Sequence, residues 1–221
     1  MSLAIFDLDE TLIDGNSPSL WIEHLGRLGW LDPESFVTRE RELARLYNAR
    51  QASLEDYLAH TLQPLVGRTP EEVAYVAEPF VEEVIEPLIL SDAMRCVAAH
   101  RAAGDRILII SATPTFLVEA IAGRLGIEDV LGTDLALAHA HAHGHYSGAI
   151  EGIPCAREGK LHMLEAWLAG QPQDMAQVHF YSDSINDLPL LAAVGRPHAV
   201  NPDPPLRAHA EAEGWNILDW R

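Results

Sequence analysis

Cysteine and long apolar runs are both scarce in this chain. Two cysteines in 221 residues cannot build a disulfide framework, and we expect Cys96 and Cys155 to be reduced, buried thiols. No apolar run approaches the roughly 20 residues that a membrane-spanning helix needs, so we predict no membrane association. The N-terminus carries neither the basic region nor the cleavage site of a signal peptide. Together these absences predict a cytoplasmic protein.

Positive charge is also in short supply. The chain has 15 Lys and Arg against 33 Asp and Glu, a formal net charge of −18. Such a chain repels phosphate backbones, so we predict no nucleic-acid binding. A small phosphorylated ligand would require cations gathered locally. Apolar residues nevertheless make up 48% of the sequence, which is typical of a soluble globular protein with a substantial core.

The pattern along the chain divides it into two kinds of segment. Leu3 to Phe6 reads as a short buried strand, and residues 15–87 read as helices only. Within that helical segment, Ser53 can cap one helix, and Thr69 with Glu72 forms a capping box for another. From residue 88 onward, apolar strands alternate with helices. We therefore predict a core domain of residues 1–14 and 88–221, with a small all-helical domain, 15–87, inserted into it.

The alternation after residue 88 predicts a parallel sheet covered by helices on both faces, that is, a doubly wound α/β fold. The expected strands are "RILIISATP", "VLGTDLAL", "YSGAI", "QVHFYSDS", "PHAVN" and "WNIL". Ligand sites in such sheets lie at the carboxyl ends of the strands. The functional residues should therefore be polar side chains that directly follow an apolar run.

Polar side chains occupy those positions at three strand ends. Asp7 and Asp9 follow the first strand, Ser111 closes another, and Asp183 follows a third. Carboxylates that converge at one edge repel each other and lose hydration, so a cation is expected among them. An all-oxygen ligand set suits Mg²⁺, which we predict as the cofactor.

The same residues can perform phosphoryl transfer. Asp7 can attack phosphorus in line and form an aspartyl phosphate. Asp9 is placed to protonate the leaving alkoxide and then to deprotonate the attacking water. The hydroxyl of Ser111 and the ammonium group of Lys160, near the start of a predicted helix, suit the remaining phosphoryl oxygens.

The chain resembles the haloacid dehalogenase superfamily, specifically its phosphatases close to phosphoserine phosphatase. The resemblance spans nearly the whole chain and rests on four motifs in order: "DLDET", "LIISAT", "REGKLHML" and "SDSINDLPLL". It implies a Rossmann-like core with a small helical cap that closes over the substrate.

The resemblance also implies residue roles. Asp7 is then the nucleophile and a metal ligand, Asp9 the acid and base whose backbone carbonyl faces the metal, and Asp183 a further ligand that Asp187 supports. Thr11 would position Asp9 or its loop. The residues implied to contact the substrate are Thr11, Ser111, Ala112, Lys160 and Asn186.

Two departures from the phosphoserine phosphatase pattern bear on the substrate. Asn16 stands where those enzymes carry a glutamate that faces the substrate amine. Ala112 and Thr113 replace two glycines that let backbone approach a substrate closely. We expect a small phosphorylated metabolite, with amino-alcohol phosphates such as histidinol phosphate or phosphoserine as candidates.

Two alternative functions stay open from the sequence. The protein could pass the phosphoryl group to an alcohol acceptor, or it could bind a phosphorylated ligand or a partner without catalysis. The oligomeric state is also open, and the protein could be a monomer or a homodimer. The turn containing His139, His141, His143 and His145 is expected to be a solvent-facing hairpin, with transition-metal binding as the alternative.

Overall fold

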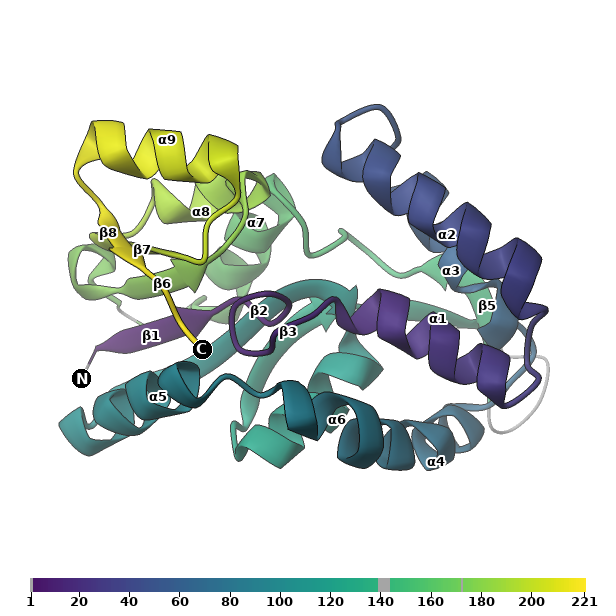
Figure 1. Cartoon of the computed structure of the whole chain (residues 1–221). Helices are drawn as coiled ribbons and strands as arrows, with labels where there is room; N and C mark the ends of the chain where they lie inside the picture. The colour runs from purple at the N-terminus through teal and green to yellow at the C-terminus, as the bar shows by residue number, and fades with distance from the viewer. Residues whose placement is uncertain (1, 139–143, 172) are drawn as a thin grey trace.

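A six-stranded parallel sheet forms the centre of the described part of the chain. The computed structural model describes residues 2–138, 144–171 and 173–221 (Figure 1). The strand order is β3-β2-β1-β6-β7-β8, and every neighbouring pair is parallel. The strands are β1 (Leu3–Phe6), β2 (Arg106–Pro114), β3 (Asp129–Thr133), β6 (His179–Ser182), β7 (Arg196–Val200) and β8 (Asn216–Leu218).

The sheet is covered on both faces, which confirms the predicted doubly wound α/β fold. Side chains alternate across β1, so Phe6 packs into one core and Ile5 into the other. Helices α5 (Ser91–Ala103) and α6 (Thr115–Leu125) supply buried residues to the core that contains Phe6. The opposite core receives residues from α7 (Glu158–Trp167), α8 (Leu188–Leu191) and α9 (Pro204–Glu213).

Residues 15–87 contain helices and no strand, as their pattern predicts. The elements are α1 (Ser17–Arg27), α2 (Pro33–Asn48), α3 (Leu54–Thr61), η1 (Gln63–Leu65), α4 (Pro70–Phe80), η2 (Val81–Ile85) and η3 (Glu86–Leu88). The predicted cap at Ser53 and the capping box of Thr69 and Glu72 are both present. Helix α4 packs against α6 of the core. The boundaries of a separate cap domain stay a prediction.

One expected strand is broken in two. "VLGTDLAL" forms β3 in the main sheet and then, after Asp134, β4 (Leu135–Ala138) in a hairpin with β5 (His145–Ile150). The break occurs at Asp134 because its side chain accepts a hydrogen bond from Thr115 and its carbonyl accepts one from Glu151. Both bonds divert the chain from the sheet.

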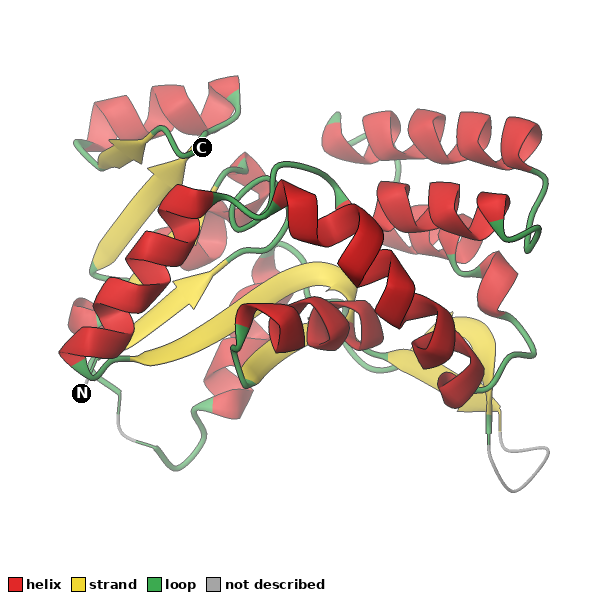
Figure 2. Ribbon diagram, turned by 60° about the horizontal axis from the view of Figure 1, so that its bottom comes forward, coloured by secondary structure: helices red, strands yellow, loops and turns green. Residues whose placement is uncertain are grey.

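The hairpin joins the helical segment rather than the main sheet. The Gly67 amide donates to the Tyr146 carbonyl at 3.0 Å, and the Tyr146 amide donates to the Arg68 carbonyl at 2.9 Å. Figure 2 shows the hairpin and the inserted helices at the same end of the molecule. His145 begins β5, whereas His139, His141 and His143 lie outside the described residues.

Both cysteines are free thiols, as expected, although only Cys155 is fully buried and Cys96 is partly exposed. Burial raises the pKa of the Cys155 thiol to about 12, which makes it unreactive. Within the described ranges, no helix combines the length and the apolarity that crossing a membrane requires.

Candidate active site

The ends of three neighbouring strands open onto one cavity of about 580 Å³. Asp7 directly follows β1, Ser111 lies near the end of β2, and Asp183 directly follows β6. All three side chains line this cavity. Because β2, β1 and β6 are adjacent and parallel, residues more than 70 positions apart in sequence meet at one edge of the sheet.

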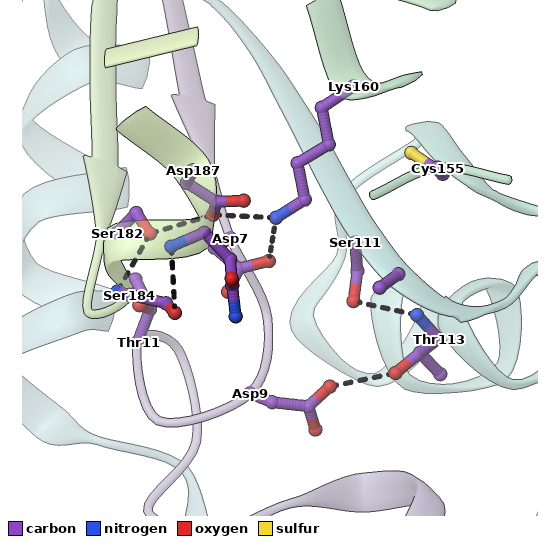
Figure 3. A network of polar contacts seen from close by, with 12 residues as sticks. Asp7, Asp9, Thr11, Ser111, Thr113, Cys155, Lys160, Ser182, Ser184 and Asp187 are labelled. Atoms are coloured by element: carbon purple, nitrogen blue, oxygen red, sulfur yellow. Dashed lines mark hydrogen bonds and ion pairs between the residues drawn. The ribbon is translucent and has the colours of Figure 1, made fainter. Parts of the chain in front are cut away.

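A buried lysine bridges two of the aspartates in this cavity (Figure 3). The Lys160 ammonium donates to Asp7 Oδ1 at 2.7 Å and to Asp187 Oδ2 at 2.7 Å. Ser182 Oγ donates to the same Asp187 oxygen at 2.7 Å. Only 3% of the Lys160 side chain is exposed, so this ion pair is shielded from solvent. Helix α7 delivers Lys160 from its first turn.

Asp7, Asp183 and Asp187 lie around one buried ammonium group, that of Lys160, and the pKa values of Asp7, Asp183 and Lys160 are shifted. Burial raises the pKa of Asp7 to about 7, with Lys160 opposing the shift and Asp187 adding to it. Burial also raises the pKa of Asp183 well above its usual range, and the charges of Asp7 and Asp187 raise it further. Burial opposes the charged form of Lys160, but the two carboxylates beside it outweigh burial and raise its pKa. Ionisation of the Asp7 and Asp183 carboxyl groups is therefore disfavoured unless further positive charge is supplied.

Asp9 lies on the other side of the cavity and does not contact Lys160 directly. One carboxylate oxygen of Asp9 accepts a hydrogen bond from the Ser17 amide at the start of α1, and the other accepts one from Thr113 Oγ1 at 2.7 Å. Burial raises the pKa of Asp9 even though both hydrogen bonds favour its ionised form. A carboxyl group with a raised pKa is suited to donating a proton.

The remaining residues singled out by sequence divide into two groups. Ser111, Ala112 and Asn186 line the cavity, and Ser111 Oγ accepts a hydrogen bond from the Thr113 amide at 3.2 Å. Thr11 is fully buried and does not line the cavity; its hydroxyl lies 3.4 Å from Asp183 Oδ1. Thr113, and not Thr11, is the threonine that contacts Asp9.

Thr113, Ser17 and Tyr47 contribute to the site and were not predicted as site residues from the sequence. Thr113 could have been found, because residues two apart on a strand point to the same side, and Thr113 follows Ser111 by two. Ser17 hydrogen-bonds Asp9 through its backbone amide and its side chain, and no pattern in the sequence marks it. Tyr47 and Arg157 line the cavity where α2 of the helical segment meets the core: the Arg157 guanidinium lies over the Tyr47 ring and bonds the Tyr47 carbonyl at 3.3 Å.

The donor atoms in the cavity suit a hard divalent cation. Asp7 and Asp183 supply carboxylate oxygens, and the raised pKa values of both groups are relieved by added positive charge. Among the residues that the structure describes, no three His, Cys, Asp or Glu side chains gather closely enough to hold a metal by themselves. At this site the Asp9 carboxylate is bonded to Ser17 and Thr113, so its backbone carbonyl is the Asp9 oxygen left for a cation.

Comparison with known proteins gives consistent matches over the whole chain. The family described as haloacid dehalogenase-like hydrolase matches residues 4–192. A histidinol-phosphatase of Neisseria meningitidis serogroup C is 36% identical, covering 100% of this chain and 99% of that protein. A phosphoserine phosphatase of Mycobacterium tuberculosis is 31% identical, covering 99% of this chain and 70% of that protein.

A solved structure is also similar. The crystal structure of a protein of unknown function from Bordetella pertussis Tohama I superposes with a TM-score of 0.90 at 38% identity. The match covers 99% of this chain and 98% of that one. The whole arrangement of sheet, inserted helices and hairpin is therefore shared with a protein seen by crystallography.

Proposed function

The chain belongs to the haloacid dehalogenase-like hydrolases and is a phosphatase, and from this premise we propose that it is a Mg²⁺-dependent phosphomonoesterase with Asp7 as nucleophile. The observation that carries the proposal is the cavity at the strand ends. There Asp7 is held by the one buried lysine that faces it, opposite Asp9 and beside Asp183.

The proposed chemistry has two steps. An oxygen of Asp7 attacks phosphorus, the bond between phosphorus and the ester oxygen breaks, and Asp9 gives its proton to the leaving alkoxide. Water then attacks the phosphorus of the aspartyl phosphate, and Asp9 takes up the water proton while Asp7 is released. Lys160 and Ser111 lie where they can bind phosphoryl oxygens.

Mg²⁺ would be held by the carboxylates of Asp7 and Asp183 together with the backbone carbonyl of Asp9. Asp187 would support the site indirectly, through its ion pair with Lys160. When bound, the ion supplies positive charge that stabilises phosphoryl oxygens. The protein's own part is to hold Asp7 in line and to keep Asp9 protonated until the leaving group departs.

The proposed substrate is a small phosphate ester of an amino alcohol. Histidinol phosphate and phosphoserine are the substrates named for the two relatives above, and both carry an amine near the ester. Asn16, which stands where phosphoserine phosphatases carry a glutamate, lines the cavity and caps α1 by accepting a hydrogen bond from the Ser19 amide. Because the Asn16 side chain is uncharged, a carboxylate that pairs with the amine has to belong to another residue. A cytoplasmic location and a monomeric or dimeric state stay predictions.

The experiment is hydrolysis of p-nitrophenyl phosphate with and without Mg²⁺. We expect Asp7→Asn to abolish turnover while leaving the melting temperature close to that of the wild type. Asp219→Asn is the matched control, because its side chain is 79% exposed and does not line the cavity. Turnover by a pure Asp7→Asn sample at the wild-type rate would reject the covalent mechanism.

A further inference from the structure

We propose that Glu40 is the residue that selects phosphate esters carrying a cationic amine. The inference rests on the proposed function, because it concerns the substrate of the same cavity. In this proposal the carboxylate on α2 pairs with the substrate amine, which the uncharged side chain of Asn16 cannot do.

Glu40 lies on the face of α2 that borders the cavity. Ala44 and Tyr47 follow Glu40 at helical spacings of four and seven, which places all three on one face of the helix. Ala44 and Tyr47 both line the cavity, as does Ser19 of α1. Ser19 Oγ donates to Glu40 Oε1 at 2.7 Å, so the Glu40 carboxylate lies directly behind the cavity wall.

The Glu40 carboxylate is buried without a cation. Only 1% of the residue is exposed, and its recorded partners are two neutral hydroxyls, those of Ser19 and, at 3.0 Å, of Tyr57. Both hydroxyls donate to the same carboxylate oxygen, Oε1. Acidic side chains are almost never fully buried unless they are paired, because the charge loses its hydration.

The charged residues near Glu40 that form ion pairs or hydrogen bonds do so with other groups. Glu42, on the same helix, is half exposed and forms an ion pair with Arg39 at 2.6 Å. Arg157 is the cation that reaches α2 from the core, but it bonds the carbonyl of Tyr47 and the side chain of Asn186. Neither Arg39 nor Arg157 is therefore available to pair with Glu40.

The chemistry of the cavity favours an amine for that role. A carboxylate only accepts hydrogen bonds, and it binds an ammonium group more strongly than a hydroxyl because the bond is charge-assisted. Lys160 and Ser111, which suit the phosphoryl group, also line the cavity. A substrate that is anionic at one end and cationic at the other would match these two residues and the Glu40 carboxylate behind Ser19.

The test compares matched pairs of esters with the wild type and Glu40→Gln, which keeps the size of the side chain and one carbonyl oxygen. The pairs are histidinol phosphate with its analogue lacking the amino group, and O-phosphoserine with its analogue lacking the amino group. The readout is the ratio of kcat/KM for the amine ester to that for its analogue. In Glu40→Gln we expect this ratio to fall about 10- to 100-fold in the preferred pair, the loss of one charge-assisted hydrogen bond.

Glu42→Gln is the control, because it removes the same charge from the same helix at an exposed position and should leave the ratio unchanged. Should Glu40→Gln fold poorly, Glu40→Asp keeps the charge but shortens its reach, and the ratio should fall by a smaller factor. A Glu40 variant that loses activity equally on both members of a pair would overturn the proposal, because that outcome indicates a structural role only. So would a wild type that prefers neither amine ester. An inactive wild type on p-nitrophenyl phosphate would instead reject the proposed phosphatase chemistry.

Discussion

Replacing Lys160 by methionine in the metal-free protein should remove a large part of its stability. Lys160 contacts Asp7 and Asp187, each at 2.7 Å, and is 3% exposed. Methionine fills a similar volume but leaves both carboxylates buried without a cation. Breaking a buried ion pair by removing one partner costs about 3–5 kcal/mol, out of a total of about 5–15 kcal/mol for an ordinary domain.

The matched control is Arg39→Met in α2. The Arg39–Glu42 pair has nearly the same length, 2.6 Å, but its side chains are 53% and 52% exposed. Exposed pairs contribute about 0–1 kcal/mol, because water solvates the charges whether or not they are paired. The two variants therefore separate the effect of burial from that of charge removal.

Urea unfolding in the presence of a chelator, followed by circular dichroism, measures both variants. We expect a lower midpoint for Lys160→Met at an unchanged slope. Adding Asp187→Asn to Lys160→Met should recover part of the loss, because it removes one of the unpaired carboxylates. If Lys160→Met costs no more than Arg39→Met, the argument that Lys160 balances buried charge is wrong.

Three further predictions test other parts of the structure. Thr113→Val should lower kcat for p-nitrophenyl phosphate about 10-fold, because Asp9 loses the hydrogen bond from Thr113 Oγ1. A rate equal to the wild type would show that the bond is dispensable. Burial lowers the pKa of His198 to about 4, so between about pH 6.5 and 4 the unfolded chain binds a proton that the folded chain does not. The free energy of unfolding should therefore fall by up to about 3 kcal/mol as pH drops from about 6.5 to 4. If a His198→Phe variant shows the same dependence of unfolding free energy on pH, His198 is not the cause. Gly159 lies in the first turn of α7, and Gly159→Ala would place a Cβ 2.0 Å from the carbonyl oxygen of Pro154. This variant should lower both the melting temperature and the activity. Gly123→Ala is the control: its Cβ would have no atom within 4 Å, and it should raise the melting temperature slightly.

The sequence was most informative where the signal is local. Strand β1 and the helices that begin at Ser53 and Thr69 follow from apolar runs and capping residues, since these depend on residues within a few positions of one another. "VLGTDLAL" was misassigned because its break depends on Thr115 and Glu151, which its own letters do not reveal. The packing of the β4–β5 hairpin against residues 67 and 68 was equally invisible.

For the site too, the sequence predicted the positions of residues along the chain, and the fold determined their contacts. The sequence by itself determined that Asp7, Ser111 and Asp183 lie at strand ends, because alternating strands and helices bring the carboxyl ends of parallel strands to one edge. Only the tertiary structure decided the orientation of each side chain. Lys160 reaches Asp7 across 153 positions of sequence, and Thr113 reaches Asp9 across 104.

Glu40 is the clearest case of a property that only the tertiary structure decided. In the sequence it is one acidic residue in a strongly charged helix, next to Arg39 and Arg41. The fold pairs those arginines with other glutamates and turns Glu40 inward to two hydroxyls. Local sequence fixes which residues share a helix face, but the neighbouring elements that cover that face determine whether a charge is solvated, paired or left available for a ligand.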